Sequence, residues 1–117
     1  MKYLVDQNTF EELWFNKPTD PIPNHVRKSD RAWIIYFTAS WCGPCRRVDK
    51  TELELASERT GVPLWICDID SNDYTSGYCG VRSIPYFMFM KPKTIVSEFQ
   101  SSSTHEIVNW MEANARK

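Results

Sequence analysis

The fold is decided by the stretch Ser40-Trp41-Cys42-Gly43-Pro44-Cys45-Arg46, in which two residues separate two cysteines. An apolar run, Ala32 to Phe37, precedes this stretch and a helical pattern follows it, so it is predicted to join a strand to a helix. A helix that begins at Cys42 would place unpaired backbone N–H groups and the positive end of its dipole beside that sulfur. Both stabilise a thiolate, so Cys42 is predicted to be a nucleophile that is more exposed and more acidic than Cys45.

The second cysteine is predicted to complete a dithiol switch. Cys45 lies one turn further into the predicted helix, close enough to attack a mixed disulfide formed on Cys42. Pro44 is tolerated between them because a first-turn N–H has no partner within the helix, and its fixed φ stiffens the loop. Arg46 and Arg47 add positive charge nearby. The pattern therefore indicates reversible redox chemistry between the two sulfurs.

Two segments, Phe37 to Cys45 and Ser83-Ile84-Pro85, resemble the active-site signature and the cis-proline loop of the thioredoxin family. A CxxC pair alone is a weak signal because zinc ribbons use the same spacing. The tryptophan, the Gly-Pro interior and the downstream Ile-Pro make the resemblance specific. It covers the chain from Leu4 to Ala115, and it implies an α/β thioredoxin fold, a mixed central β-sheet flanked by helices on both faces.

The resemblance also implies roles for residues around the dithiol. The Ile84–Pro85 bond is expected to be cis and to lie against the cysteines, with the backbone of Ile84 pairing with an extended substrate chain. A proline at the edge of a strand, without a function, is the alternative. Trp41 is expected to be a partly exposed cover over the sulfurs. Five residues are predicted to form an apolar rim that docks partner proteins: Trp41, Gly43, Pro44, Ile84 and Pro85.

Length, composition and charge narrow the class of protein. The chain has 117 residues, of which 42% are hydrophobic and 25% charged, which predicts one compact domain over residues 1–117. A net charge of −1 gives no reason to expect nucleic acid or an anionic membrane as a partner. Met1 to Phe10 lacks the apolar run of a signal peptide, and no stretch has the length of a membrane span. We expect a cytoplasmic monomer.

Periodicity and turn residues predict the order of the elements. The predicted strands are residues 2–5, 32–37, 62–69, 86–90 and 94–99. The predicted helices begin at Thr9, Cys42, Asp73 and Ser103, and the second of them is predicted to run without a break to Gly61. Residues 16–31 are predicted to form an extended loop. A tolerated surface insertion is favoured for this loop over a segment that contacts a partner.

The remaining cysteines, two aspartates and two histidines could in principle bind a metal ion, but each has a simpler interpretation. Cys67 is interpreted as an inert core residue, and Cys79 is a candidate for secondary oxidation. A zinc site would need a second CxxC, which this chain lacks, so no metal is predicted. Four further polar residues are interpreted as a polar strand end or as surface groups: Asp68, Asp70, His25 and His105.

The chain departs from the family pattern at a buried position. Members usually carry an aspartate six residues before the first cysteine, where this chain has Tyr36, and the lysine that pairs with it falls near Ile66. A tyrosine, with a reference pKa near ~10, cannot serve as a base at neutral pH. Dithiol exchange with a slow resolving step is therefore expected. Pro92 and Lys93 replace the usual glycine in the last turn, so the docking surface is expected to differ.

The resemblance implies a protein disulfide reductase. Cys42 would attack a disulfide in a protein substrate and Cys45 would resolve the intermediate. A thioredoxin reductase would then re-reduce the pair, with no metal or organic cofactor. Two alternatives stay open. One is an oxidase or isomerase of the same fold, although Gly-Pro rather than histidine between the cysteines favours a reductant. The other is a binding subunit of a larger assembly, in which redox chemistry is incidental.

Overall fold

The computed structural model describes residues 2–15 and 32–116, so the predicted loop over 16–31, with His25, lies outside the described residues. The strands are β1 Lys2–Tyr3, β2 Trp33–Thr38, β3 Leu64–Asp68, β4 Tyr86–Lys91 and β5 Thr94–Phe99. The helices are α1 Gln7–Trp14, a 3₁₀ helix over Pro44–Arg47, α2 Lys50–Thr60, α3 Asp73–Tyr78 and α4 Thr104–Ala115. No helix within the described ranges has the length and apolar character needed to cross a membrane.

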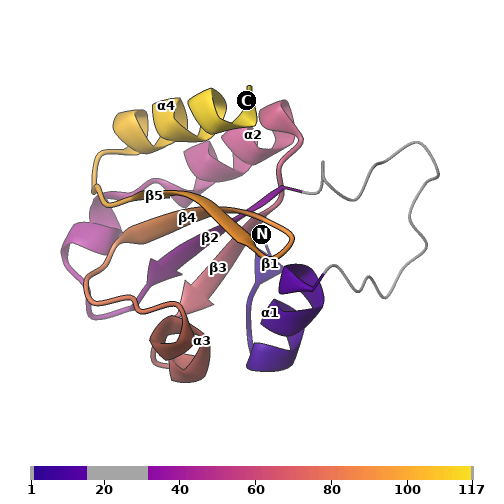
Figure 1. Ribbon diagram of the computed structural model, residues 1–117. Helices are drawn as coiled ribbons and strands as arrows, with labels where there is room; N and C mark the ends of the chain where they lie inside the picture. The colour runs from indigo at the N-terminus through magenta and orange to yellow at the C-terminus, as the bar shows by residue number, and fades with distance from the viewer. Residues whose placement is uncertain (1, 16–31, 117) are drawn as a thin grey trace.

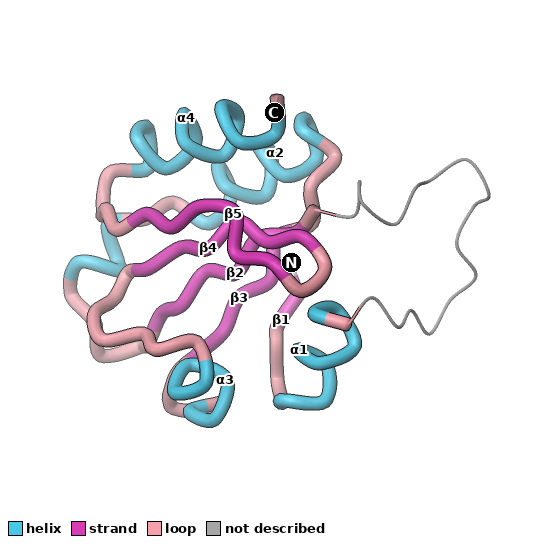
Figure 2. Tube along the Cα trace, in the orientation of Figure 1, coloured by secondary structure: helices cyan, strands magenta, loops and turns pink. Residues whose placement is uncertain are grey.

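The strands form one mixed sheet in the order β1-β3-β2-β4-β5. β1, β3 and β2 are parallel, whereas β4 and β5 are antiparallel to their neighbours. Helices α2 and α4 cover one face of the sheet, and α1 and α3 cover the other (Figures 1 and 2). The predicted fold class, a mixed sheet with helices on both faces, is confirmed.

The central strand β2 is buried along its whole length. Ile34 and Tyr36 pack among the residues of α2 and α4, whereas Ile35 and Phe37 pack on the opposite face with Phe10 of α1. Successive side chains of a strand point to opposite faces, so a strand covered on both faces is apolar at every position. The prediction of a strand buried on both faces is confirmed, and the loop that follows this strand carries the cysteines.

The first helix begins earlier than predicted. α1 starts at Gln7, and the Asp6 carboxylate accepts a hydrogen bond from the Thr9 N–H at 2.9 Å. Asp6 is therefore the cap, and the predicted start at Thr9 is wrong. Aspartate and threonine both serve as N-caps, so the local pattern offered two competing starts. The predicted start of α4 is confirmed, because Ser103 accepts from the Glu106 N–H at 3.3 Å.

The continuous helix predicted from Cys42 to Gly61 is wrong. The 3₁₀ helix ends at Arg47, and the backbone of Val48 after it is extended, with φ −79° and ψ 122°. α2 then begins at Lys50 with its own cap, since the Asp49 carboxylate accepts from the N–H groups of Thr51 and Glu52. Its dipole therefore starts beyond this break rather than beside Cys42. The predicted end is confirmed, because Gly61 terminates α2 with φ 74°.

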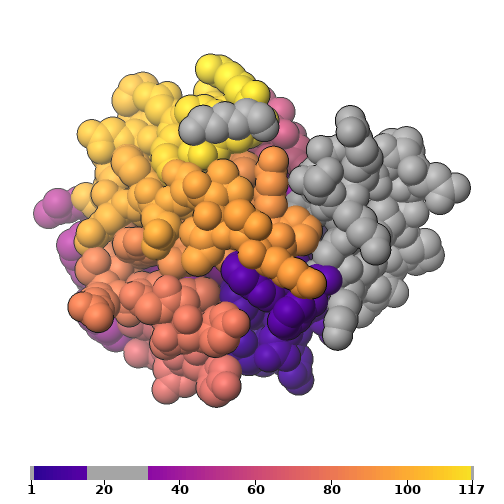
Figure 3. Space-filling view, in the orientation of Figure 1, coloured from indigo at the N-terminus to yellow at the C-terminus, as the bar shows by residue number. Residues whose placement is uncertain are grey.

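The turn between β4 and β5 is tied to the end of α1. Lys93 has a left-handed backbone, with φ 57°, and its N–H donates to the Trp14 carbonyl at 2.8 Å. Its ammonium nitrogen lies 5.8 Å from the centre of the Phe15 ring. Figure 3 shows the turn, in orange, against α1, in indigo. The last hairpin therefore contacts the end of the first helix directly.

Candidate active site

The two cysteines lie just beyond the carboxyl end of β2 and are joined by a disulfide, with their Cα atoms 5.3 Å apart. The chain forms a tight turn after β2, in which the Cys42 N–H donates to the Ala39 carbonyl at 3.2 Å. Cys42 and Cys45 are each 4% exposed. The predicted greater exposure of Cys42 is therefore wrong for the disulfide form. Ile69 and Ile84, from two other segments, pack against the cluster that Ala39, Cys42 and Cys45 form.

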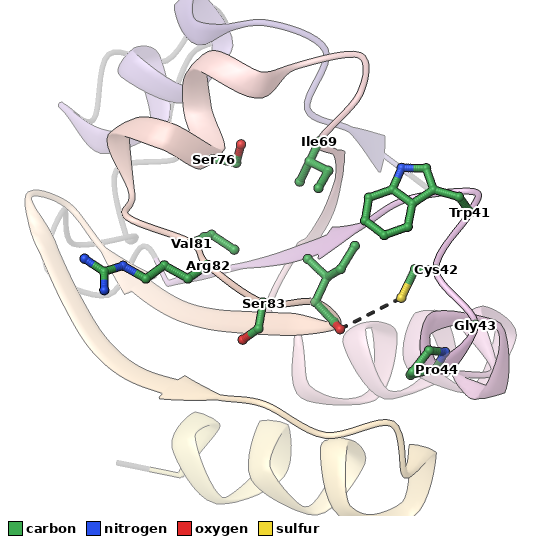
Figure 4. A pocket seen from close by; sticks show the side chains of 10 residues that line it. Trp41, Cys42, Gly43, Pro44, Ile69, Ser76, Val81, Arg82 and Ser83 are labelled. Carbon is green, nitrogen blue, oxygen red and sulfur yellow. Dashed lines mark hydrogen bonds between the residues drawn. The ribbon is translucent and has the colours of Figure 1, made fainter.

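Access to a groove nevertheless distinguishes the two sulfurs. A hollow of about 420 Å³ opens beside Cys42, and Cys45 is not among the residues that line it. One wall comes from the cysteine loop and the other from the segment before β4 and the end of β3 (Figure 4). Its lining consists of Trp41, Cys42, Gly43, Pro44, Ile69, Ser76, Val81, Arg82, Ser83 and Ile84. A substrate that enters this groove meets Cys42 first.

A backbone amide supplies the electrostatic support at Cys42. The Cys45 N–H donates to the Cys42 sulfur at 3.2 Å. Hydrogen bonds to a charged sulfur are stronger than those to a neutral one, so this contact favours a thiolate on Cys42 after reduction. The dipole of α2 begins after the break at Val48. The local N–H of the 3₁₀ turn therefore takes the place of the predicted helix terminus.

The Ile84–Pro85 peptide bond is cis, as predicted. The Ile84 carbonyl oxygen lies 3.9 Å from the Cys42 sulfur, which Figure 4 marks with a dashed line. Four of the five predicted rim residues, Trp41, Gly43, Pro44 and Ile84, line the groove. Pro85 does not line it and is buried, so its placement on the rim is a wrong prediction.

Polar residues at the end of β3 form hydrogen bonds with the cysteine loop and with each other, not with the sulfurs. Trp41 is 62% exposed, as expected of a cover, and its indole N–H donates to the Asp70 carboxylate at 2.8 Å. The Asp68 carboxylate accepts from the Asp70 N–H at 2.9 Å. Both carboxylates thus have partners, which agrees with a polar strand end. The Arg46 guanidinium donates to the Ser40 carbonyl at 3.2 Å, so it also braces this loop.

Tyr36 contacts the second cysteine through the backbone. Its side chain is fully buried, its ring stacks on Phe87 with centroids 4.5 Å apart, and its hydroxyl donates to the Cys45 carbonyl at 3.4 Å. Burial raises the pKa of Tyr36, although a hydrogen bond with Thr38 opposes the rise. The phenol is therefore a donor at neutral pH. Sequence reasoning singled out this position but not its contact with Cys45.

The other two cysteines are free thiols on the face of the sheet that α1 and α3 cover. Burial raises the pKa of Cys67 to about 12 and that of Cys79 to about 11. Cys67 is fully buried, which confirms it as a core residue. Across residues 2–15 and 32–116, no three histidine, cysteine or acidic side chains cluster in a way that would hold a metal ion. His105 lies on the exposed surface of α4, as predicted.

Sequence reasoning missed four residues of the groove: Ile69, Ser76, Val81 and Arg82. Val81 and Arg82 precede the Ile-Pro pair directly, so their position in the chain was a usable signal. Ile69 directly follows β3 and Ser76 belongs to α3, and only the topology brings them to the groove. Arg82 is the charged residue of this lining, and it extends away from Cys42 (Figure 4).

Comparison with known proteins gives consistent matches. The family model described as Thioredoxin matches residues 18–113. Thioredoxin of Geodia cydonium is 37% identical over 70 residues, which are 60% of this chain and 66% of that protein. Thioredoxin H5 of Arabidopsis thaliana is 31% identical over 96 residues, 82% of this chain and 77% of that protein. The X-ray structure of Fasciola hepatica thioredoxin has a TM-score of 0.76 at 25% identity and covers 97% of this chain and 98% of its own.

Proposed function

This chain belongs to the thioredoxin family and is a thiol–disulfide oxidoreductase, and from this premise we propose that it reduces disulfides in protein substrates. The observation that carries the proposal is the one-sided access to the dithiol. Cys42 lines the groove and Cys45 does not, so an incoming disulfide reaches the first sulfur alone. We assign Cys42 as the nucleophile and Cys45 as the resolving cysteine.

The proposed reaction has two exchange steps. The Cys42 thiolate attacks one sulfur of the substrate disulfide, so a Cys42–substrate bond forms and the other substrate sulfur leaves as a thiolate, which takes a proton from solvent. Cys45, having lost its proton, then attacks the Cys42 sulfur. The Cys42–Cys45 bond forms, the second substrate thiolate leaves, and two electrons have passed to the substrate. The Cys45 N–H at 3.2 Å supports the Cys42 thiolate that begins the sequence.

The substrate is proposed to lie in the groove as an extended segment. Trp41, Pro44 and Ile84 offer apolar surface on both sides of Cys42. The Ile84 carbonyl lies 3.9 Å from the Cys42 sulfur, so a strand-like backbone alongside it would bring its own half-cystine to that sulfur. Gly43 also lines the groove, whereas Pro85, after the cis bond, is buried.

The proposal extends to partners and surroundings. We propose one domain over residues 1–117, acting as a monomer that a thioredoxin reductase re-reduces. The redox group is the Cys42–Cys45 pair itself, so the exchange steps need no metal or organic cofactor. Nucleic acid and membrane are not proposed as partners, because the net charge is −1. A cytoplasmic location accords with the free thiols of Cys67 and Cys79, since reducing compartments keep thiols unpaired.

Insulin reduction tests the proposal. The wild-type protein should accelerate precipitation of insulin chains by dithiothreitol, and should do so with NADPH and a thioredoxin reductase in place of dithiothreitol. Acceleration of disulfide formation or reshuffling without net reduction would favour an oxidase or isomerase instead. Loss of both cysteines, in a Cys42→Ser, Cys45→Ser variant, should end the activity. If that variant kept the protein's biological role, the protein would be a binding subunit.

A further inference from the structure

Tyr36 is a buried titratable residue that the proposed exchange steps do not use. The Tyr36 side chain is wholly inside the core between the sheet and the helices α2 and α4, yet it carries a polar hydroxyl. A buried hydroxyl needs a hydrogen-bond partner, because burial removes it from water. The hydroxyl donates to the Cys45 carbonyl.

The Cys45 carbonyl belongs to the 3₁₀ helix Pro44–Arg47. It accepts two hydrogen bonds, one from the Val48 N–H at 3.2 Å and one from the Tyr36 hydroxyl at 3.4 Å. Val48 is the residue at which the backbone becomes extended before α2. Tyr36, on the rigid central strand, therefore connects the sheet to the turn that carries the second sulfur.

The phenol lies in a largely apolar cluster, and Thr38 of the same strand is a polar neighbour that hydrogen-bonds with it. The apolar residues come from every element that packs there: Ile34 of β2, Ile66 of β3, Phe87 and Phe89 of β4, Leu53 of α2, and Ile107 and Met111 of α4. The stack on Phe87 fixes the ring, so the hydroxyl has a defined position. Its hydrogen bond goes to the Cys45 carbonyl oxygen rather than to a sulfur.

We propose that Tyr36 is a positioning residue for the resolving step: its hydroxyl holds the Cys45 turn against β2, so that the Cys45 sulfur faces Cys42. This inference rests on the proposed function and adds a residue to it. The step that Tyr36 supports is the attack of the Cys45 thiolate on Cys42 in the mixed disulfide, which forms the Cys42–Cys45 bond and expels the substrate thiolate. The proton of Cys45 goes to solvent, not to Tyr36.

The test separates the two exchange steps with dithiobis-nitrobenzoate, a small aromatic disulfide that releases a coloured thiolate at each. Attack by Cys42 releases the first thiolate, and attack by Cys45 on the Cys42 mixed disulfide releases the second. The Tyr36→Phe variant keeps the ring and removes the hydroxyl. Its first phase should match the wild type, and its second phase should be slower by about twofold to fivefold, because the lost hydrogen bond is neutral and long.

The pH profile distinguishes positioning from proton transfer. If Tyr36 only positions the turn, the midpoint of the second phase against pH should be the same in the wild type and in Tyr36→Phe. A shifted midpoint would mean that the phenol acts on the thiol proton, and the inference would be wrong.

The Ser57→Ala variant is the matched control. Ser57 also donates a buried hydroxyl hydrogen bond to a backbone carbonyl, that of Val62 at 2.6 Å, but it does so away from the cysteines. Both phases should be unchanged in it. A normal second phase in Tyr36→Phe, or an equal slowing in Ser57→Ala, would overturn the positioning role. A wild-type protein that releases no coloured thiolate would instead overturn the proposed function itself.

Discussion

Cys42 and Cys67 are both buried, at 4% and 0% exposure, but their surroundings differ in how well they stabilise a thiolate. The Cys42 sulfur accepts a backbone N–H at 3.2 Å, and it borders the groove. A carbonyl oxygen lies near each sulfur, that of Ile84 at 3.9 Å from Cys42 and that of Asn72 at 3.7 Å from Cys67, so the acceptor does not distinguish them. The N–H donor favours a thiolate on Cys42, whereas burial raises the pKa of Cys67 to about 12.

This difference shows that exposure alone does not identify the reactive thiol. Cys79 is more exposed than Cys42 in this structure, but burial and the Glu98 carboxylate raise its pKa to about 11. The reactive cysteine is instead the one with an N–H donor and a groove beside it. Three experiments test this contrast between the cysteines.

The largest expected effect is on turnover. Cys42→Ser should lower insulin reduction to the rate of the protein-free reaction, because no other sulfur lines the groove. Cys79→Ala should leave the rate unchanged and is the control. Residual activity in Cys42→Ser that disappears on further mutation of Cys79 would show that the contrast between the two thiols is wrong.

The second effect is on the rate of alkylation. In the reduced protein near pH 8, Cys42 should be labelled first, whereas Cys79 should be about one thousandth ionised, given its pKa of about 11. A raised pKa keeps the thiol protonated, so labelling of Cys79 should rise about tenfold per pH unit up to that pKa. Peptide mass spectrometry over a pH series measures both. Labelling of Cys79 at the rate of Cys42 near neutral pH would contradict this assignment.

The smallest effect is on stability. Cys67→Ala removes a fully buried sulfur from the core under α1, and it should lower the free energy of unfolding by about 1 kcal/mol without changing turnover. Urea unfolding of the reduced protein measures the change. Cys79→Ala, at a partly exposed position, should cost less. A loss of turnover in Cys67→Ala at unchanged stability would mean that Cys67 is more than a core residue.

Much of the fold followed from local patterns. The unbroken apolar run before Cys42 predicted the central strand, and Gly61 predicted the end of α2. The break at Val48 was missed although the sequence carries a signal for it. Asp49 and Glu52 have the spacing of a helix start, but the apolar residues before and after them continue one helical period.

The sequence predicted which two cysteines form the site, but it did not predict how buried they are. The CxxC signature located Cys42 and Cys45 because it is contiguous in the chain. Ile69 and Ile84 pack against the cluster that contains both cysteines, and strand order and loop path bring them there. The contact of Tyr36 was missed for the same reason. The residue type can be read from the sequence, but the partner of its hydroxyl depends on how the turn folds back on β2.

The tie between Lys93 and Trp14 has a consequence for the chain as it emerges from the ribosome. The hydrogen-bond donor to the carbonyl at the end of α1 is an N–H almost eighty residues later in the chain, in the turn of the last hairpin. Contacts of such long separation form late, since the loop between them must close first. The first helix to be synthesised therefore completes its docking only after the last hairpin has left the ribosome.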